Sequence, residues 1–155
     1  MISNEQSQLL KLAQEVQQLT FSLVSYLSET GVAEPDFTTS SSEISYSAAY
    51  TSIRAKPNEV AQDLLLLVNG PRIEACRFVC SHNDLGAYQF AFKFGLIYKG
   101  PQEGKISLLD LSEQTRIDEI CLGRMLRLLC SRRLFIEPEP DHFAHTSMTI
   151  IYAQD

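Results

Sequence analysis

The N-terminal part of the chain carries one apolar stripe at helical spacing. Between residues 3 and 29, apolar side chains recur every three or four positions, and Gln, Lys, Glu and Ser fill the positions between them. This spacing predicts an amphipathic helix that ends at Gly31. Such a stripe packs either on its own domain or on another subunit, and we expect a dimer interface. The stripe consists of Leu9, Leu12, Val16, Leu19, Leu23 and Tyr26.

Residues 32–47 are polar and rich in Ser and Thr. Such a composition is typical of a linker or loop. We therefore expect three segments: an amphipathic N-terminal helix over 1–31, this linker, and a folded domain over 48–155.

The start of that domain has a helical pattern with two interruptions. We expect a helix over 48–55, a break at Pro57, and a second helix over 58–69 that ends at Gly70 and Pro71. The second helix should be largely buried, because its apolar positions cover more than half of its circumference. These positions are Val60, Ala61, Leu64, Leu65, Leu67 and Val68.

Two more helices are expected over 72–82 and 85–98, with a turn at His82–Asp84 between them. The aromatic alternation in YQFAFKFGLIY also fits a strand. We favour a helix, because Gln89 and Lys93 then lie on one face. The stretch GPQEG that follows predicts a loop.

The C-terminal third predicts a helix-turn-helix followed by a hairpin. Ser107 and Asp110 form a capping box for a helix over about 108–115, and Asp118 caps a second helix that ends near Ser131. Short strands are expected over 134–137 and 142–146. The predicted fold class is therefore mainly α, a winged helix with additional N-terminal dimerisation helices.

Four segments of the chain, taken in order, resemble a known family. LIYKG, DLSEQT, GRMLRLLCSRRLF and FAHTS occur in the order found in the N-terminal dimerisation domain of fungal-type S-adenosylmethionine-dependent O-methyltransferases. The resemblance covers about residues 58–149. It implies that two subunits interlock through this domain and that each forms part of the wall of its partner's substrate pocket.

The chain departs from that family in what it lacks. The cofactor domain of such enzymes needs a glycine-rich loop, but no two of the seven glycines form G-x-G and none follows Gly123. We therefore expect no cofactor and no methyl transfer by this chain alone. A stand-alone protein is expected rather than a fragment.

Charge and composition limit the kinds of partner and the compartment that we expect. The net charge of −6 and the absence of a basic n-region or a long apolar run argue against nucleic acid, secretion and membrane insertion. The four cysteines lie in apolar contexts and are expected to be buried thiols in a reducing compartment. A soluble cytoplasmic protein is predicted.

Candidate catalytic residues are few. Hydrogen-bonding or acid–base groups at a pocket rim are His82, Asp84, Tyr88, Arg77 and His145. Cys76, Cys80 and His82 could begin a zinc site, but no fourth ligand is evident, so no metal is expected. His142 and His145 are predicted to share one face of their strand. The simpler interpretation is that this face is a solvated or capping face rather than a functional site.

Two functions of different class remain open. In the first, a homodimer binds a small apolar or aromatic natural-product intermediate, such as a polyketide. It then promotes a cofactor-free step: cyclisation, pericyclic closure, isomerisation or dehydration. In the second, it is a non-catalytic assembly module that pairs with itself or with a full-length pathway enzyme. DNA binding is a minor alternative. A local excess of positive charge comes from Arg116, Arg124, Arg127, Arg132 and Arg133, but the acidic residues Glu137, Glu139 and Asp141 of the wing would face the phosphates.

Overall fold

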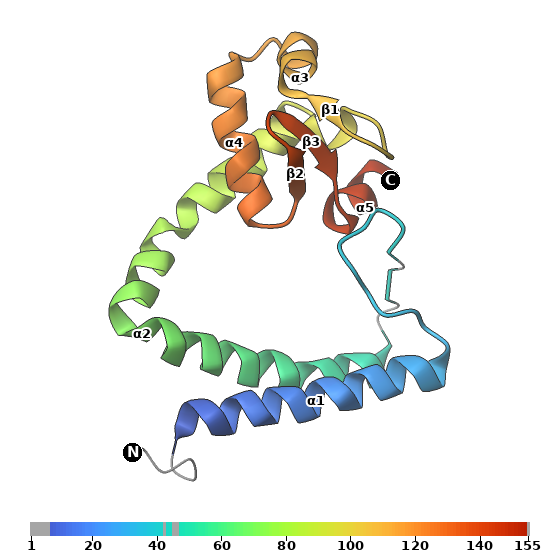
Figure 1. Ribbon diagram of the computed structural model, residues 1–155, viewed down its shortest axis with the longest axis vertical. Helices are drawn as coiled ribbons and strands as arrows, with labels where there is room; N and C mark the ends of the chain where they lie inside the picture. Colours follow the sequence, from blue (N-terminus) through green and yellow to red (C-terminus); the bar gives the residue numbers. More distant parts are fainter. Residues whose placement is uncertain (1–6, 42, 45–46, 155) are drawn as a thin grey trace. The chain divides into compact units, whose positions relative to one another are not determined.

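The computed structural model describes residues 7–41, 43–44 and 47–154. It is mainly helical with one small antiparallel sheet, so the predicted fold class is confirmed as a winged-helix-like arrangement (Figure 1). The elements are α1 (Gln8–Thr30), α2 (Ala48–Lys93), the 3-10 helix η1 (Leu96–Tyr98), β1 (Ile106–Ser107), α3 (Leu108–Thr115), α4 (Glu119–Ser131), β2 (Phe135–Glu139), β3 (His142–His145) and α5 (Ser147–Gln154).

The described residues divide into two compact units. The first unit consists of the described residues of 1–35 and 42–79. The second unit consists of residues 36–41 and the described residues of 80–155. The polar segment 36–41 thus belongs to the second unit. The sequence instead predicts segment boundaries at residues 31 and 47. That division of the chain into domains stays a prediction.

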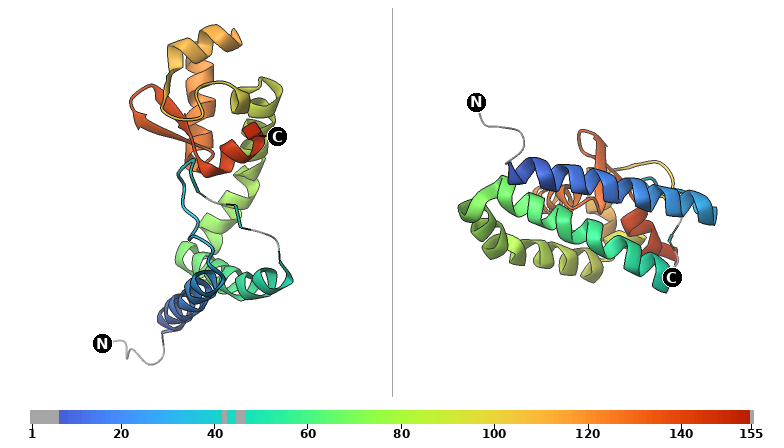
Figure 2. Two further views of the ribbon diagram at one scale, coloured as in Figure 1. Left: turned by 90° about the vertical axis from the view of Figure 1, so that its right-hand side faces the viewer. Right: turned by 90° about the horizontal axis from the view of Figure 1, so that it is seen from below.

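In the first unit, α1 lies antiparallel beside the first half of α2 (Figures 1 and 2). The Ser7 hydroxyl caps its N-terminus, and Gly31 ends it in the left-handed conformation, as the sequence predicts. The rings of Tyr26 and Tyr50 stack with centroids 6.4 Å apart. Leu27 and Val60 are the buried apolar side chains of the pair.

Gly70 interrupts α2. Its φ of 71° and ψ of 165° are non-helical, and Pro71 then starts the next helical stretch. The predicted end at Gly70 is confirmed. The predicted break at Pro57 is wrong, because the helix continues through it. A proline removes one backbone hydrogen bond at a cost of about 3 kcal/mol, and the helical turns on both sides of Pro57 offset that loss.

The helix also continues through His82–Asp84, so the predicted turn there is wrong. This stretch contains neither glycine nor proline, and Asn and Asp are tolerated inside a helix. The aromatic stretch is helical up to Lys93, which confirms helix over strand. The ring centroids of Phe90 and Phe94, one turn apart, are separated by 4.7 Å.

Both caps of the helix-turn-helix are confirmed. The Ser107 hydroxyl accepts a hydrogen bond from the Asp110 amide at 3.0 Å and donates one to the Asp110 carboxylate at 2.6 Å. The Asp118 carboxylate accepts from the Cys121 amide at 3.0 Å. These contacts set the start of α3 and α4, whose buried side chains include Leu111, Leu122 and Leu126.

The sheet has the strand order β1-β3-β2, with both pairs antiparallel. Phe135 lies opposite His145, Ile136 lies opposite Ala144, and the register shifts between Ile136 and Glu139. The predicted hairpin is confirmed to within two residues at each strand end. Sequence reasoning missed β1 and α5, because a two-residue strand and a short C-terminal helix carry too little pattern.

The core of the second unit forms where α2, α3, α4 and the sheet meet. Its fully buried members are aliphatic or aromatic, and α5 packs on η1 and β3. The core consists of Ala87, Ala91, Leu96, Ile97, Leu108, Leu111, Leu122, Leu126, Leu129, Leu134, Phe135 and Phe143. None of the described helices is both long enough and apolar enough to cross a membrane.

Candidate functional site

The five predicted catalytic residues do not form one group. Arg77 pairs with Glu74 one turn away, at 3.0 Å. His82 is exposed on α2. Asp84 and Tyr88 lie one helical turn apart in a polar cluster on the second unit, whereas His145 is buried beside η1 and α5. The possible role of each residue therefore follows from its own surroundings.

Asp84 and Tyr88 form the strongest polar cluster among these candidates. Asp84 forms an ion pair with Arg132, the residue after α4. Tyr88 is half-buried, and burial raises the pKa of its phenol, with smaller contributions from Tyr152 and Asp84 that outweigh the lowering by Arg132. A phenol with a raised pKa stays protonated at neutral pH and is a hydrogen-bond donor. Arg132 was missed because it lies 48 residues from Asp84.

His145 joins three elements rather than facing solvent. Its Nδ1 lies 3.1 Å from the Thr149 hydroxyl, and its Nε2 lies 3.2 Å from the Lys99 carbonyl oxygen. Burial lowers the pKa of this imidazole, which favours the neutral form. The neutral tautomer donates from Nε2 to Lys99 and accepts at Nδ1. This arrangement holds α5 and the end of η1 on β3.

The predicted common face of the two wing histidines is wrong. His142 lies half-buried with its Nδ1 3.0 Å from the Pro140 carbonyl oxygen, and His145 is buried opposite Phe135. Their spacing of three residues puts them on opposite faces of a strand, because successive side chains alternate. His142 and His145 therefore cannot act together.

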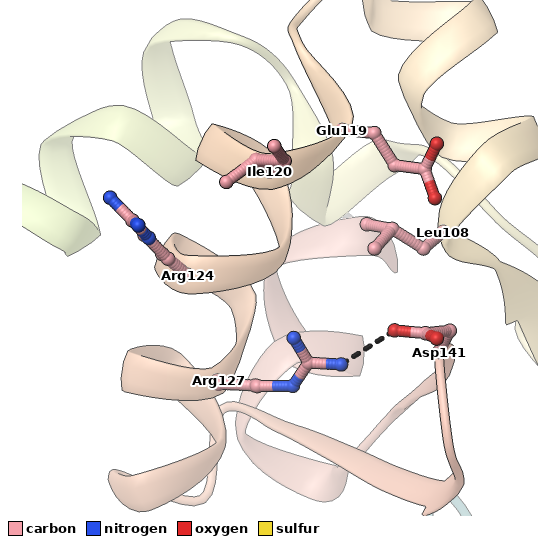
Figure 3. Close-up of a pocket in the computed structure, with 6 residues that line it drawn as sticks. All are labelled: Leu108, Glu119, Ile120, Arg124, Arg127 and Asp141. Carbon is pink, nitrogen blue, oxygen red and sulfur yellow. Dashed lines mark hydrogen bonds and ion pairs between the residues drawn. The ribbon is translucent and has the colours of Figure 1, made fainter.

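A groove of about 380 Å³ lies on the solvent face of α4 (Figure 3). Apolar and charged side chains from α3, α4 and the hairpin turn line it, and the Arg127 guanidinium points across it to Asp141. The lining contains no serine, cysteine or histidine, and one of its two carboxylates, that of Asp141, is paired with Arg127, so the groove offers mainly charged and apolar contacts for binding. It is lined by Leu108, Glu119, Ile120, Arg124, Arg127 and Asp141.

Acidic residues of the wing hold the central arginine of α4. Arg127 donates to Glu137 at 2.7 Å and to Asp141 at 2.6 Å. Its hydrogen bonds to both carboxylates raise the pKa of Arg127, and the bond from Arg127 lowers the pKa of Glu137. Arg132 is paired with Asp84 in the same way. Guanidiniums engaged by carboxylates, such as those of Arg127 and Arg132, are poorly placed to contact phosphates.

Several apolar side chains of the first unit are exposed. Leu65, Leu67 and Val68 expose 49%, 45% and 64% of their surface, although the sequence predicts a buried helix there. That prediction is wrong for these three residues in the single chain, because α1 covers only one side of this stretch (Figure 2). It holds for Val60, which is buried, and in part for Ala61 and Leu64, which are half-buried. Four consecutive aliphatic residues point to all sides of a helix. The exposed apolar set of this unit includes Leu9, Leu10, Phe21, Leu65, Leu66, Leu67, Val68 and Ile73.

The cysteines also differ from expectation. Cys76, Cys80 and Cys121 are exposed in the single chain, and Cys130 is half-buried with its pKa raised by burial to about 11. Burial was predicted from apolar sequence neighbours, but Val79 beside Cys80 and Ile120 beside Cys121 are themselves exposed. Within the described part of the chain, no three His, Cys, Asp or Glu side chains are close enough to hold a metal ion.

Comparison with known proteins places the fold. No family model matches the chain. The O-methyltransferase sol2 of Alternaria solani is 33% identical over 147 residues, which cover 95% of this chain and 34% of that enzyme. The chlorophenol O-methyltransferase of Trichoderma longibrachiatum is 29% identical over 97% of this chain and 32% of that enzyme. The chain thus spans about a third of the length of these relatives.

Solved structures agree on the fold. The crystal structure of OxaC superposes with a TM-score of 0.63 over 91% of this chain and 33% of OxaC, at 18% identity. OxaC in complex with SAH and oxaline gives the same TM-score. The helical, winged-helix-like fold of this chain corresponds to the N-terminal domain of fungal O-methyltransferases, as the resemblance predicts. The chain is an O-methyltransferase-related protein.

Proposed function

We propose that this chain is a subunit-pairing domain of the O-methyltransferase type and that it forms a homodimer. The observation that carries this proposal is the exposed aliphatic run Leu65–Val68 in the first unit. A helix that is apolar on all sides is normally enclosed by other helices. Burying one such side chain contributes about 1.5–3 kcal/mol, so a second subunit that covers the run is strongly favoured.

The predicted stripe on α1 belongs to the same proposal. Leu9 is 42% exposed, whereas the other five stripe residues are half-buried in the single chain. Tyr26 already stacks on Tyr50 of the same chain. We therefore assign the N-terminal end of the stripe, near Leu9, to the partner subunit and its C-terminal end to the intrachain contact with α2.

Methyl transfer is not proposed for these residues. The described sheet is antiparallel and has three short strands, whereas the cofactor domain of such enzymes is built on a parallel sheet with a glycine-rich loop. The residues present therefore do not fit S-adenosylmethionine. A full-length pathway enzyme as a second partner remains a proposal that follows from the family.

A second candidate is the cofactor-free catalyst acting on a small apolar or aromatic intermediate. The half-buried Tyr88, with Asp84 and Arg132 beside it, favours this candidate, because it could donate a hydrogen bond to a carbonyl. One relative is named for chlorophenol. Since Arg77, His82 and His145 have separate environments, this role ranks below pairing. Tyr88→Phe should leave the oligomeric state unchanged and remove turnover if the catalyst exists.

Sedimentation equilibrium tests the pairing role. Val68→Arg places a charge in the exposed aliphatic run and should weaken the dimer by at least about tenfold. Leu109→Arg is the matched control, because Leu109 on α3 is 56% exposed but lies in the second unit and outside the groove on α4. Equal dimer affinity in the wild type and in Val68→Arg would overturn the proposed interface.

A further inference from the structure

A second cavity, of about 360 Å³, lies on the outer face of the β2–β3 hairpin. Ile136 and Ala144 are direct cross-strand partners, and both line it. Two loops complete it: Phe37–Thr39 from the segment before α2, and the turn that contains Gln102 and Gly104. All of these residues belong to the second unit.

The wall formed by Phe37 is fixed in place. The Phe37 carbonyl oxygen accepts a hydrogen bond from the Ser147 amide at 3.3 Å, and the Ser147 hydroxyl donates to the Asp36 carbonyl oxygen at 2.8 Å. The Arg133 guanidinium lies 5.4 Å from the centre of the Phe37 ring. The aromatic wall is therefore held before any ligand binds, which reduces the entropy lost on binding.

The lining is free of formal charge. It contains no Asp, Glu, Lys or Arg, although these residues make up 21% of the chain, and its one titratable member, His145, is buried and favours the neutral form. An anion or a cation that entered would lose hydration without an opposite charge in the lining. An uncharged aromatic ring would instead contact Phe37, Ile136 and Ala144.

Polar groups at the rim of the cavity can orient a ligand by hydrogen bonding. The side chains of Thr39 and Gln102 line the cavity and make no hydrogen bond to any other residue that the structure describes. The amide of Gln102 can both donate and accept. A hydroxyl or carbonyl on the ligand would satisfy it, in keeping with small-molecule sites that combine apolar walls with a few polar groups.

We propose that this cavity binds a small, uncharged aromatic compound that bears a hydroxyl or carbonyl group. The site lies on the hairpin face of the second unit, and the proposal does not depend on subunit pairing. The ring packs between Phe37 and the pair Ile136–Ala144, and Gln102 bonds the polar substituent.

Calorimetry on the full chain tests the proposal with two probes of one shape. At neutral pH 2-naphthol is uncharged and 2-naphthoate is an anion. We expect 2-naphthol to bind at least about tenfold more tightly than 2-naphthoate. Ala144→Phe fills the cavity from the outer face of β3 and should abolish binding. Ala75→Phe, at an exposed alanine on α2, adds the same bulk elsewhere and should leave binding unchanged.

Gln102→Leu tests the polar contact separately. It should weaken 2-naphthol about tenfold while leaving the unfolding transition in place. Three results would overturn the proposal: no binding of 2-naphthol, equal binding of both probes, or equal binding by the wild type and Ala144→Phe. Circular dichroism of Ala144→Phe distinguishes a blocked cavity from an unfolded chain, and Gln102→Leu keeps the test decisive if Ala144→Phe fails to fold.

Discussion

Arg127 on α4 and Glu137 on β2 form a two-point contact: Nε lies 3.0 Å from Oε2 and Nη2 lies 2.7 Å from Oε1. The Asp141 amide donates to the same Glu137 carboxylate at 2.9 Å. One carboxylate thus connects α4, β2 and the hairpin turn. Because Arg127 holds the pKa of Glu137 below its ordinary value, this contact makes the stability of the wing depend on pH.

The sign of that dependence follows from linkage. Glu137 contributes stability above its ordinary pKa of 4.5, and the contribution is lost as the pH falls through the lower pKa of the folded state. Urea unfolding below pH 4.5 should therefore show a smaller acid loss in Glu137→Gln than in the wild type. Glu113→Gln, at an exposed position on α3, is the control and should follow the wild type. Identical acid profiles for wild type and Glu137→Gln would contradict the prediction.

Two glycines of α2 should respond to alanine with opposite signs. Gly70 has φ 71° and ψ 165°, a region nearly restricted to glycine, so Gly70→Ala should destabilise by about 1–3 kcal/mol. Gly86 lies inside the helix with open space around its Cα, so Gly86→Ala should stabilise by about 0.5–1 kcal/mol. Denaturant midpoints of both variants measure this. A stabilising Gly70→Ala would mean that α2 does not bend there.

His145 should make α5 pH-sensitive. Because burial lowers its pKa, its contribution is present above the ordinary value of 6.5 and is lost as the pH falls through the lower pKa of the folded state. The protection factors of the α5 amides, which correct the exchange rate for its intrinsic dependence on pH, should fall over that range in the wild type. His145→Gln should show lower protection at every pH and no such step, whereas His142→Gln, whose Nδ1 lies beside the Pro140 carbonyl oxygen of its own turn, should keep the step.

Leu9→Arg tests the assignment of the N-terminal end of α1 to the partner. The substitution adds a charge where Leu9 is 42% exposed, so it should weaken self-association while preserving helix content. Gln17→Arg, at an exposed position on the same helix, should leave association unchanged. Size-exclusion elution across a dilution series provides the comparison. If the two variants dissociate alike, the effect is one of net charge rather than of the stripe.

Much of the fold follows from local signals in the sequence. The caps Ser107 and Asp118, the stop at Gly70 and the turn before His142 each act within four residues, so their effect can be read directly. Pro57 and His82–Asp84 were misjudged as breaks because helix continuity depends on the neighbouring turns as well as on one unfavourable residue.

The site was less predictable, because its contacts are long-range. Arg132 with Asp84 and Ser147 with Asp36 join residues 48 and 111 positions apart, and no spacing rule links them. The burial of Leu65, Leu67 and Val68 was predicted from the apolar positions around the helix, and such a pattern does not say whether the covering surface comes from the same chain. His145 was selected for its chemistry, but its buried hydrogen bonds give it a structural role.

The molar mass of the wild-type protein, measured by light scattering coupled to size exclusion, tests the central claim most directly. Subunit pairing through the exposed aliphatic run predicts a mass of twice the 17.4 kDa of one chain, which falls towards one chain in Val68→Arg. A wild-type protein that elutes at the mass of one chain, with Leu65–Val68 exposed to solvent, would contradict the account.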